Sequence, residues 1–275
     1  MPITFAAAAS HAPGITAWTE AAPPDQKNNF FAGYDRLRQE LENSGTEVLI
    51  MLTSEHWANF FLDHISAFCI GRGEYFTGPV EPWLRVEKAR VPGDPALARE
   101  IIERCYENGI EPGFSFEMEL DHGTMVPLHF LTPAMNYPVV PIMFNTLADP
   151  QPTARRSLEF GRVLGQLAAE SKVRIGFVAT GGLSHDPGER NHGTIDSEFD
   201  HRFLAQMAAC DTEQLARYTK SQFAAAGGGA FELLAWIALA GAVNGRKGEV
   251  LAYEAVKPWA TGVGIVRYEI YRNGN

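Results

Sequence analysis

The sequence lacks the features that mark a membrane or exported protein. No apolar run approaches the roughly 20 residues that a membrane-spanning helix needs. No basic segment precedes the first alanine-rich stretch, residues 3–9, which is therefore interpreted as a strand rather than as a signal peptide. We expect a cytoplasmic protein with no membrane partner.

Cysteines and clusters of positive charge are also scarce. The three cysteines are an odd number without C-x-x-C spacing, so neither a disulfide framework nor a zinc ribbon is indicated. Buried, reduced thiols are expected instead. Lysine and arginine total 23 against 33 acidic residues, a net charge of −10, and they do not cluster. A nucleic acid is therefore not an expected partner.

The composition that remains suits a large globular α/β protein. The chain has 275 residues, of which 45% are hydrophobic and 20% charged. No internal repeat, low-complexity linker or shift in composition divides it, so we expect a single catalytic domain over residues 1–275.

Apolar runs of strand length alternate with segments of helical periodicity, which predicts an α/β fold. The expected strands are residues 3–9, 48–52, 65–70, 139–144, 173–179, 249–256 and 264–270. The expected helices are residues 25–43, 94–108, 153–171, 197–209, 212–223 and 230–244, with a short helix inside 125–135 that ends at Pro133. Apart from 65–70, residues 59–91 are expected to be loops. The first strand, helix and strand predict a βαβ unit with two adjacent parallel strands.

Three of the expected strands are each followed within a few residues by a histidine, namely His11, His56 and His185. The carboxyl ends of parallel strands share one edge of a sheet, so these imidazoles can converge there. One such histidine alone is more often a capping or solvent-facing residue, but three share this placement. His122, in a glycine-bearing loop, is a fourth candidate. Gly181 and Gly182, just before His185, would allow a tight turn and leave room for a flat ring.

Glu232 is the candidate carboxylate for a metal site. It lies at the start of a strongly apolar helical segment, where free backbone amides favour an anion. A glutamate in such surroundings is costly to bury without a partner. The alternative is that it faces solvent. Two histidines and one carboxylate are typical of non-haem Fe(II) oxygen chemistry, although zinc accepts the same ligands, so this pattern leaves the metal open.

Five short motifs together resemble the catalytic subunits of class III extradiol ring-cleavage dioxygenases, the group typified by the β subunit of protocatechuate 4,5-dioxygenase. The motifs run in the family's order over nearly the whole chain. They are SHAPG at 10–14, SEHW at 54–57, DHGT at 121–124, GLSH at 182–185 and FELLAW at 231–236.

The resemblance implies a three-layer α/β/α sandwich around a mostly parallel mixed sheet. It also implies an Fe(II) cofactor held by His11, His56 and Glu232, with His185 as the acid/base residue and His122 as a second active-site histidine. The implied substrates are O2 and a catechol-type ring, such as protocatechuate or gallate, which receives both oxygen atoms and is opened.

Residues near the motifs or in the closing region are expected to contact the aromatic substrate. They are Trp57, Phe60, Trp259 and Thr261. The chain lacks a small helical domain of the kind that covers the active site in some members of this family, which leaves open whether it works alone. A homo-oligomer or a complex with a separate small subunit is expected.

Two alternatives remain. The first is a zinc- or iron-dependent relative with the same ligands, such as a DOPA-type dioxygenase or a metal-dependent hydrolase. The second is a non-catalytic subunit of a dioxygenase complex. The second requires that ligands have been lost, whereas this chain keeps every residue of the implied set.

Overall fold

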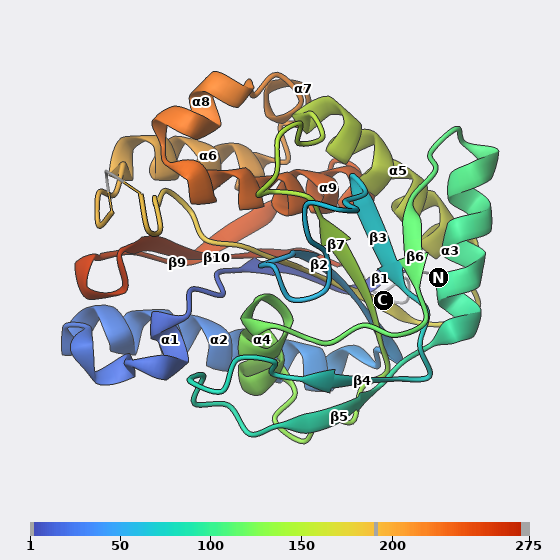
Figure 1. Cartoon of the computed structure of the whole chain (residues 1–275), viewed down its shortest axis with the longest axis horizontal. Coiled ribbons are helices and arrows are strands. Elements are labelled where there is room, and N and C mark those ends of the chain that lie inside the picture. Colours follow the sequence, from blue (N-terminus) through green and yellow to red (C-terminus); the bar gives the residue numbers. More distant parts are fainter. Residues whose placement is uncertain (1–2, 190–191, 271–275) are drawn as a thin grey trace.

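An eight-stranded mixed sheet runs through the middle of the computed structural model, which describes residues 3–189 and 192–270 (Figure 1). The strand order is β6-β3-β7-β2-β8-β1-β10-β9. The strands are β1 (Ile3–Ala9), β2 (Val48–Ser54), β3 (Phe68–Gly71), β6 (Gly113–Ser115), β7 (Val139–Phe144), β8 (Ile175–Thr180), β9 (Gly248–Val256) and β10 (Thr261–Tyr268). The four central strands are parallel and buried on both faces, as their continuous apolar runs predict.

The strand β8 lies between β1 and β2, so the predicted βαβ unit with two adjacent strands is wrong. The β8 segment, IGFVAT, is apolar on both faces and pairs in parallel with both neighbours. Ala9 lies opposite Thr180, and Leu52 lies opposite Ala179, so the three strands end at nearly the same level. The three histidines predicted from strand ends therefore follow three consecutive strands of the sheet.

Helices cover both faces of this sheet and make the predicted three-layer α/β/α sandwich (Figure 1). One face carries α3 (Pro95–Glu107), α5 (Ala154–Glu170), α6 (Ser197–Ala209), α7 (Thr212–Leu215), α8 (Lys220–Ala225) and α9 (Leu233–Val243). The other carries α1 (Gly14–Ala17), α2 (Pro24–Ser44), α4 (His122–Leu131) and a small sheet of β4 (Tyr75–Gly78) and β5 (Ala89–Pro92). This small sheet lies where loops were predicted.

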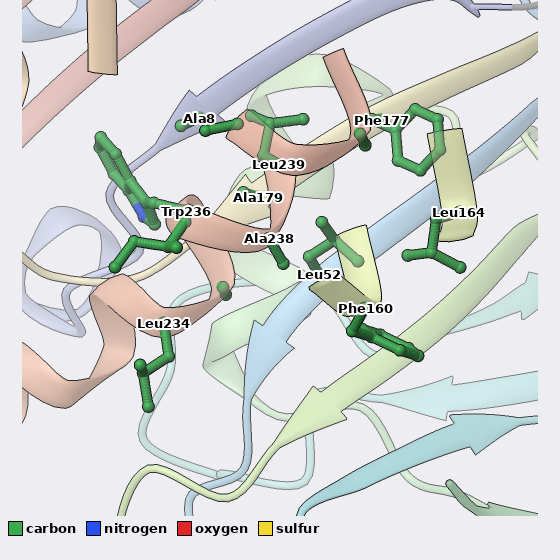
Figure 2. Close-up of a cluster of buried hydrophobic side chains, with 14 of the residues drawn as sticks. Ala8, Leu52, Phe160, Leu164, Phe177, Ala179, Leu234, Trp236, Ala238 and Leu239 are labelled. Atoms are coloured by element: carbon green, nitrogen blue, oxygen red, sulfur yellow. The ribbon is translucent and has the colours of Figure 1, made fainter. Parts of the chain in front are cut away.

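The helix α9 is buried along its whole length between the sheet and α5 (Figure 2). Its Trp236 and Leu239 belong to the same core cluster as Phe160 of α5 and Phe177 of β8. Gly161 lets the two helices approach closely, because a Cβ there would overlap the Ala238 carbonyl group. None of the described helices, α9 included, is long and apolar enough to cross a membrane.

Three helix predictions differ from the structure for local reasons. The segment 212–223 is two helices, because Thr219 and Gln222 form a capping box that begins α8. The segment 230–244 begins as a 3₁₀ turn, η2 (Gly228–Glu232), so Glu232 directly precedes α9. The helix α4 begins at His122 because Asp121 caps it, and it contains Pro127.

Candidate metal centre

The three predicted histidines and His122 meet at the carboxyl edge of the central strands. The ring centroids of His11 and His56 are 5.0 Å apart, and those of His56 and His122 are 4.0 Å apart. One nitrogen from each of these three rings lies within 4.8 Å of the other two. Residues that follow β1 and β2 and the first residue of α4, far apart in the chain, thus form one cluster that could hold a metal ion.

Two imidazoles of the cluster are oriented by carboxylates. The Nδ1 atom of His56 lies 2.9 Å from Asp121 Oδ2, and that of His122 lies 2.6 Å from Glu81 Oε1. Each carboxylate also accepts the backbone N–H of the same histidine. A carboxylate cannot donate, so it fixes a hydrogen on Nδ1 and leaves Nε2 free to act as a ligand or acceptor.

The other two imidazoles are oriented by neutral oxygens. His11 Nδ1 lies 3.0 Å from Thr180 Oγ1, whose hydroxyl donates to the carbonyl oxygen of Gly123. His185 Nδ1 lies 2.8 Å from the carbonyl oxygen of Leu183, which can only accept. In both residues Nδ1 therefore carries the hydrogen, and Nε2 is again the free nitrogen.

Glu232 lies among the free nitrogens of three of these histidines. Its carboxylate oxygens are 3.1 Å from His11 Nε2, 3.3 Å from His56 Nε2 and 3.6 Å from His185 Nε2. The residue is 4% exposed and also accepts the backbone N–H of Gly182. Burial disfavours its charge, but His11 and His185 outweigh burial and hold the pKa of Glu232 well below its ordinary value.

These residues fit a divalent metal. His11 Nε2 is a buried nitrogen that makes no hydrogen bond with any described residue, despite the nearby glutamate. A cation would satisfy both the nitrogen and the ionised carboxylate. Two ligand sets match the positions: His11, His56 and Glu232 as expected, or the three imidazoles of His11, His56 and His122.

The histidines differ in how readily they carry charge. Burial disfavours protonation of His56, but Asp121 and Glu232 outweigh it and raise the pKa of His56 well above its ordinary value. Burial likewise opposes protonation of His185, yet Glu232 raises its pKa. For His122, burial and the neighbouring His56 lower the pKa although Glu81 opposes them. Of these three histidines, His122 is therefore the one that most readily stays neutral.

His185 stands in a slot between two glycines. A Cβ on Gly182 or on Gly229 would overlap the imidazole ring, so both positions must lack a side chain. We expected the glycines before His185 to leave room for a flat substrate ring. In the structure the space beside Gly182 is filled by the imidazole of His185 itself. The run 227–229, which carries no recognised motif, forms the other wall of the slot.

The four expected substrate contacts fall into two groups. Trp57 and Phe60 follow His56 and line one small cavity. Thr261 is buried beside Gly182, close to His185. Trp259 is buried too, and its ring packs against Phe30 of α2. The cavity of Trp57 and Phe60 is thus not shared with the other two residues.

Sequence reasoning missed the residues that support the histidines. Asp121 could have been found, because an aspartate before a helix is a common N-cap. Glu55, which directly precedes His56 in the chain, accepts the backbone N–H groups of Trp57, Ala58 and Asn59 and so fixes the loop after β2. Glu81 carries no recognisable signal, since it lies in a loop 41 residues before its partner.

Comparison with known proteins finds similar ring-opening dioxygenases. The family model of the catalytic LigB subunit of aromatic ring-opening dioxygenase matches residues 5–264. A 2,3-dihydroxyphenylpropionate/2,3-dihydroxicinnamic acid 1,2-dioxygenase of Dechloromonas aromatica is 28% identical over 83% of this chain and 87% of its own length. A protein of the same description from Photorhabdus laumondii is 26% identical over 85% of this chain and 87% of its own length.

A solved structure of an uncharacterised protein from Escherichia coli K12 has the same fold. It superposes with a TM-score of 0.58 at 16% identity and covers 96% of this chain and 98% of that protein.

Proposed function

Because the chain belongs to the family of catalytic LigB subunits of aromatic ring-opening dioxygenases, and is thus an extradiol dioxygenase, we propose that it opens catechol-type rings at an Fe(II) centre. The observation that carries this proposal is the position of Glu232. Its buried carboxylate lies within 3.6 Å of Nε2 atoms from three histidines, and two of these, His11 and His56, are the other proposed ligands.

We propose the two-histidine, one-carboxylate set because of charge. A carboxylate ligand neutralises part of the charge of a buried divalent ion, and two imidazoles with one carboxylate leave coordination positions open. The lowered pKa of Glu232 favours its ionised form, and the residue is only 4% exposed, so solvent contributes little to stabilising that charge. His122 is then a neighbour of the ion and not one of its ligands.

When bound, Fe(II) would supply a Lewis acid and a template for the two adjacent oxygens of the substrate and for O2. His185 supplies the proton transfers. Its Nδ1–H is fixed on the Leu183 carbonyl oxygen, so Nε2 is the atom that takes a proton from a substrate hydroxyl and later returns it.

His122 holds the substrate in a fixed orientation. Its lowered pKa keeps it neutral, and its Nδ1 is engaged by Glu81, so Nε2 accepts a hydrogen bond from a substrate hydroxyl. Thr261, which is buried beside Gly182, would contact the substrate near His185, and Trp57 and Phe60 would contact it from their separate cavity after His56. Trp259 would act through Trp18, to whose carbonyl oxygen its indole N–H donates.

The substrate is proposed to be a vicinal diol. Protocatechuate, gallate and the dihydroxyphenyl compounds named for the relatives all share two adjacent ring oxygens that can bind one metal ion. We further propose that the chain is one catalytic domain, that it works in the cytoplasm, and that it acts as a homo-oligomer or with a small subunit. Sedimentation at several protein concentrations, with and without such a subunit, tests the last point.

The function is tested by reconstitution. Metal-free protein is loaded with Fe(II) or Zn(II) under nitrogen, and oxygen uptake and the yellow ring-opened product are followed with a panel of catechols. We expect turnover with Fe(II) and none with Zn(II). Turnover that does not consume oxygen would support a hydrolase and overturn the proposal.

Metal content tests the ligand set separately. His11→Ala and Glu232→Ala should lose the ion, because each removes a ligand, whereas His122→Ala should keep about one ion per chain. Loss of iron from His122→Ala and retention in Glu232→Ala would establish the three-histidine set instead.

A further inference from the structure

Two tryptophans that the expected site did not include lie next to the metal centre, Trp83 in ring contact with His122 and Trp18 in ring contact with Trp83. Trp18 follows α1 and Trp83 lies in the loop between β4 and β5. Their side chains are 44% and 48% exposed, although indoles are among the most favourable groups to bury.

The two indole rings extend a series of neighbouring rings that begins with the histidines of the metal centre. The centroids of His56 and His122 are 4.0 Å apart, those of His122 and Trp83 are 6.1 Å apart, and those of Trp83 and Trp18 are 6.4 Å apart. His122 is buried, whereas the tryptophans are half in solvent. The line therefore leads from the proposed ligand His56 to the surface.

The Trp18 indole and the loop that carries Trp83 are held in place before any ligand arrives. The Nε1–H of Trp18 donates to the Pro258 carbonyl oxygen at 3.2 Å. The loop of Trp83 is fixed on either side, because Glu81 bonds to His122 while Leu84 and Val86 are buried in the core. A ligand that stacks on these rings would not have to order them first.

We propose that Trp18 and Trp83 form a stacking subsite for an aromatic substituent carried by the catechol. The inference rests on the proposed function, because the diol must bind at the metal for the substituent to reach Trp83. The Trp83 ring is in direct contact with the His122 ring. A substituent that reaches Trp83 while the diol is at the metal is therefore one that is joined directly to the ring that is cleaved. The faces of indoles attract flat apolar rings and carry negative charge density, so a carboxylate gains nothing there.

The test compares three probes on the Fe(II)-loaded protein without oxygen, with Kd measured by calorimetry. The probes are catechol, 3-phenylcatechol and 3-(2,3-dihydroxyphenyl)propionate. Wild type should bind 3-phenylcatechol most tightly. Trp83→Ala should raise the Kd of 3-phenylcatechol about tenfold, because a stacked aromatic pair contributes up to about a factor of ten in affinity. The Kd of catechol should change by no more than about twofold.

Two further variants act as controls. Trp83→Phe should restore most of the selectivity, because it keeps a ring, and Tyr106→Ala, an exposed aromatic residue on α3, should change neither Kd. In air, Trp83→Ala should raise KM for 3-phenylcatechol by a larger factor than KM for catechol.

The outcomes separate the two proposals. If wild type does not consume oxygen with catechol, the proposed function fails. If wild type does consume oxygen with catechol, but Trp83→Ala raises the Kd of all three probes by the same factor or of none of them, the proposed subsite is overturned. A change in sedimentation of Trp83→Ala with unchanged Kd values would assign these tryptophans to contact with a second copy, and would also overturn it.

Discussion

The ends of β2 and β8 lie side by side, and each presents one histidine, yet the two are supported in different ways. His56, after β2, is backed by the buried carboxylate of Asp121. His185, after β8, is backed by a backbone carbonyl and confined by Gly182 and Gly229. A carboxylate makes an imidazole more basic and a better metal ligand. A carbonyl fixes the tautomer without adding charge, which suits a group that must gain and lose a proton.

The largest expected effect comes from removing the proton carrier. His185→Phe should lower kcat by roughly 10²–10⁴ while metal and catechol still bind, because only proton transfer is lost. Oxygen uptake and iron content measure the two properties, and His201→Phe, an exposed histidine of α6, is the matched control. Full turnover in His185→Phe would remove the residue from the mechanism.

A smaller loss should follow from filling the slot of His185. Gly229→Ala forces the imidazole out of position, and a displacement of about 1 Å costs on the order of 10²-fold in rate. Gly228→Ala is the control, because a Cβ there would only approach Asp186 Oδ1 to 3.3 Å. Equal rates for both variants would show that the slot does not position His185.

On the β2 side, removal of one charge should affect metal binding more than rate. Asp121→Asn should weaken metal affinity by about 10–100-fold, because His56 loses the carboxylate behind it. Asp94→Asn, which alters the equivalent cap of α3, separates this effect from the loss of a helix cap. If both variants bind metal as wild type does, the carboxylate is not what makes His56 a ligand.

The smallest effect concerns acid stability of the metal-free protein. Burial alone would raise the pKa of Asp121, but the charge of His56 and its hydrogen bond lower it from 3.8 to about 2. A lowered folded-state pKa stabilises the fold above the unfolded value, and this contribution disappears as the pH falls toward 2. Between pH 5 and pH 3 the stability difference between wild type and Asp121→Asn should therefore shrink by about 1 kcal/mol in urea titrations. A constant difference would contradict the lowered pKa.

The sequence allowed the strand-end histidines to be predicted because the signal is local. A buried apolar run followed by His11, His56 or His185 is visible in a short window, and parallel strands bring such positions together. Glu232 was found for the same reason, as a charge in an apolar segment. The order of the strands in the sheet could not be predicted from short windows of sequence. The position of β8 between β1 and β2 depends on pairings between residues more than 120 positions apart.

Supporting residues escaped prediction because their signals are not periodic. Glu81 and Trp83 belong to a loop whose position is set by β4 and β5, and those four-residue strands are too short to show an alternating pattern. Trp259 could be placed near the site by its position in the chain, but only the fold shows that α2 covers it.

The slot around His185 also has a consequence for motion. An imidazole held between two stretches of backbone, with Nδ1 anchored on Leu183, cannot turn over about its Cβ–Cγ bond without pushing the main chain apart. Ring flipping, which in exposed side chains takes picoseconds to nanoseconds, is therefore suppressed. The Nε2 atom therefore stays directed at Glu232, and in the proposed mechanism a proton taken up by that nitrogen would stay on the same side of the ring.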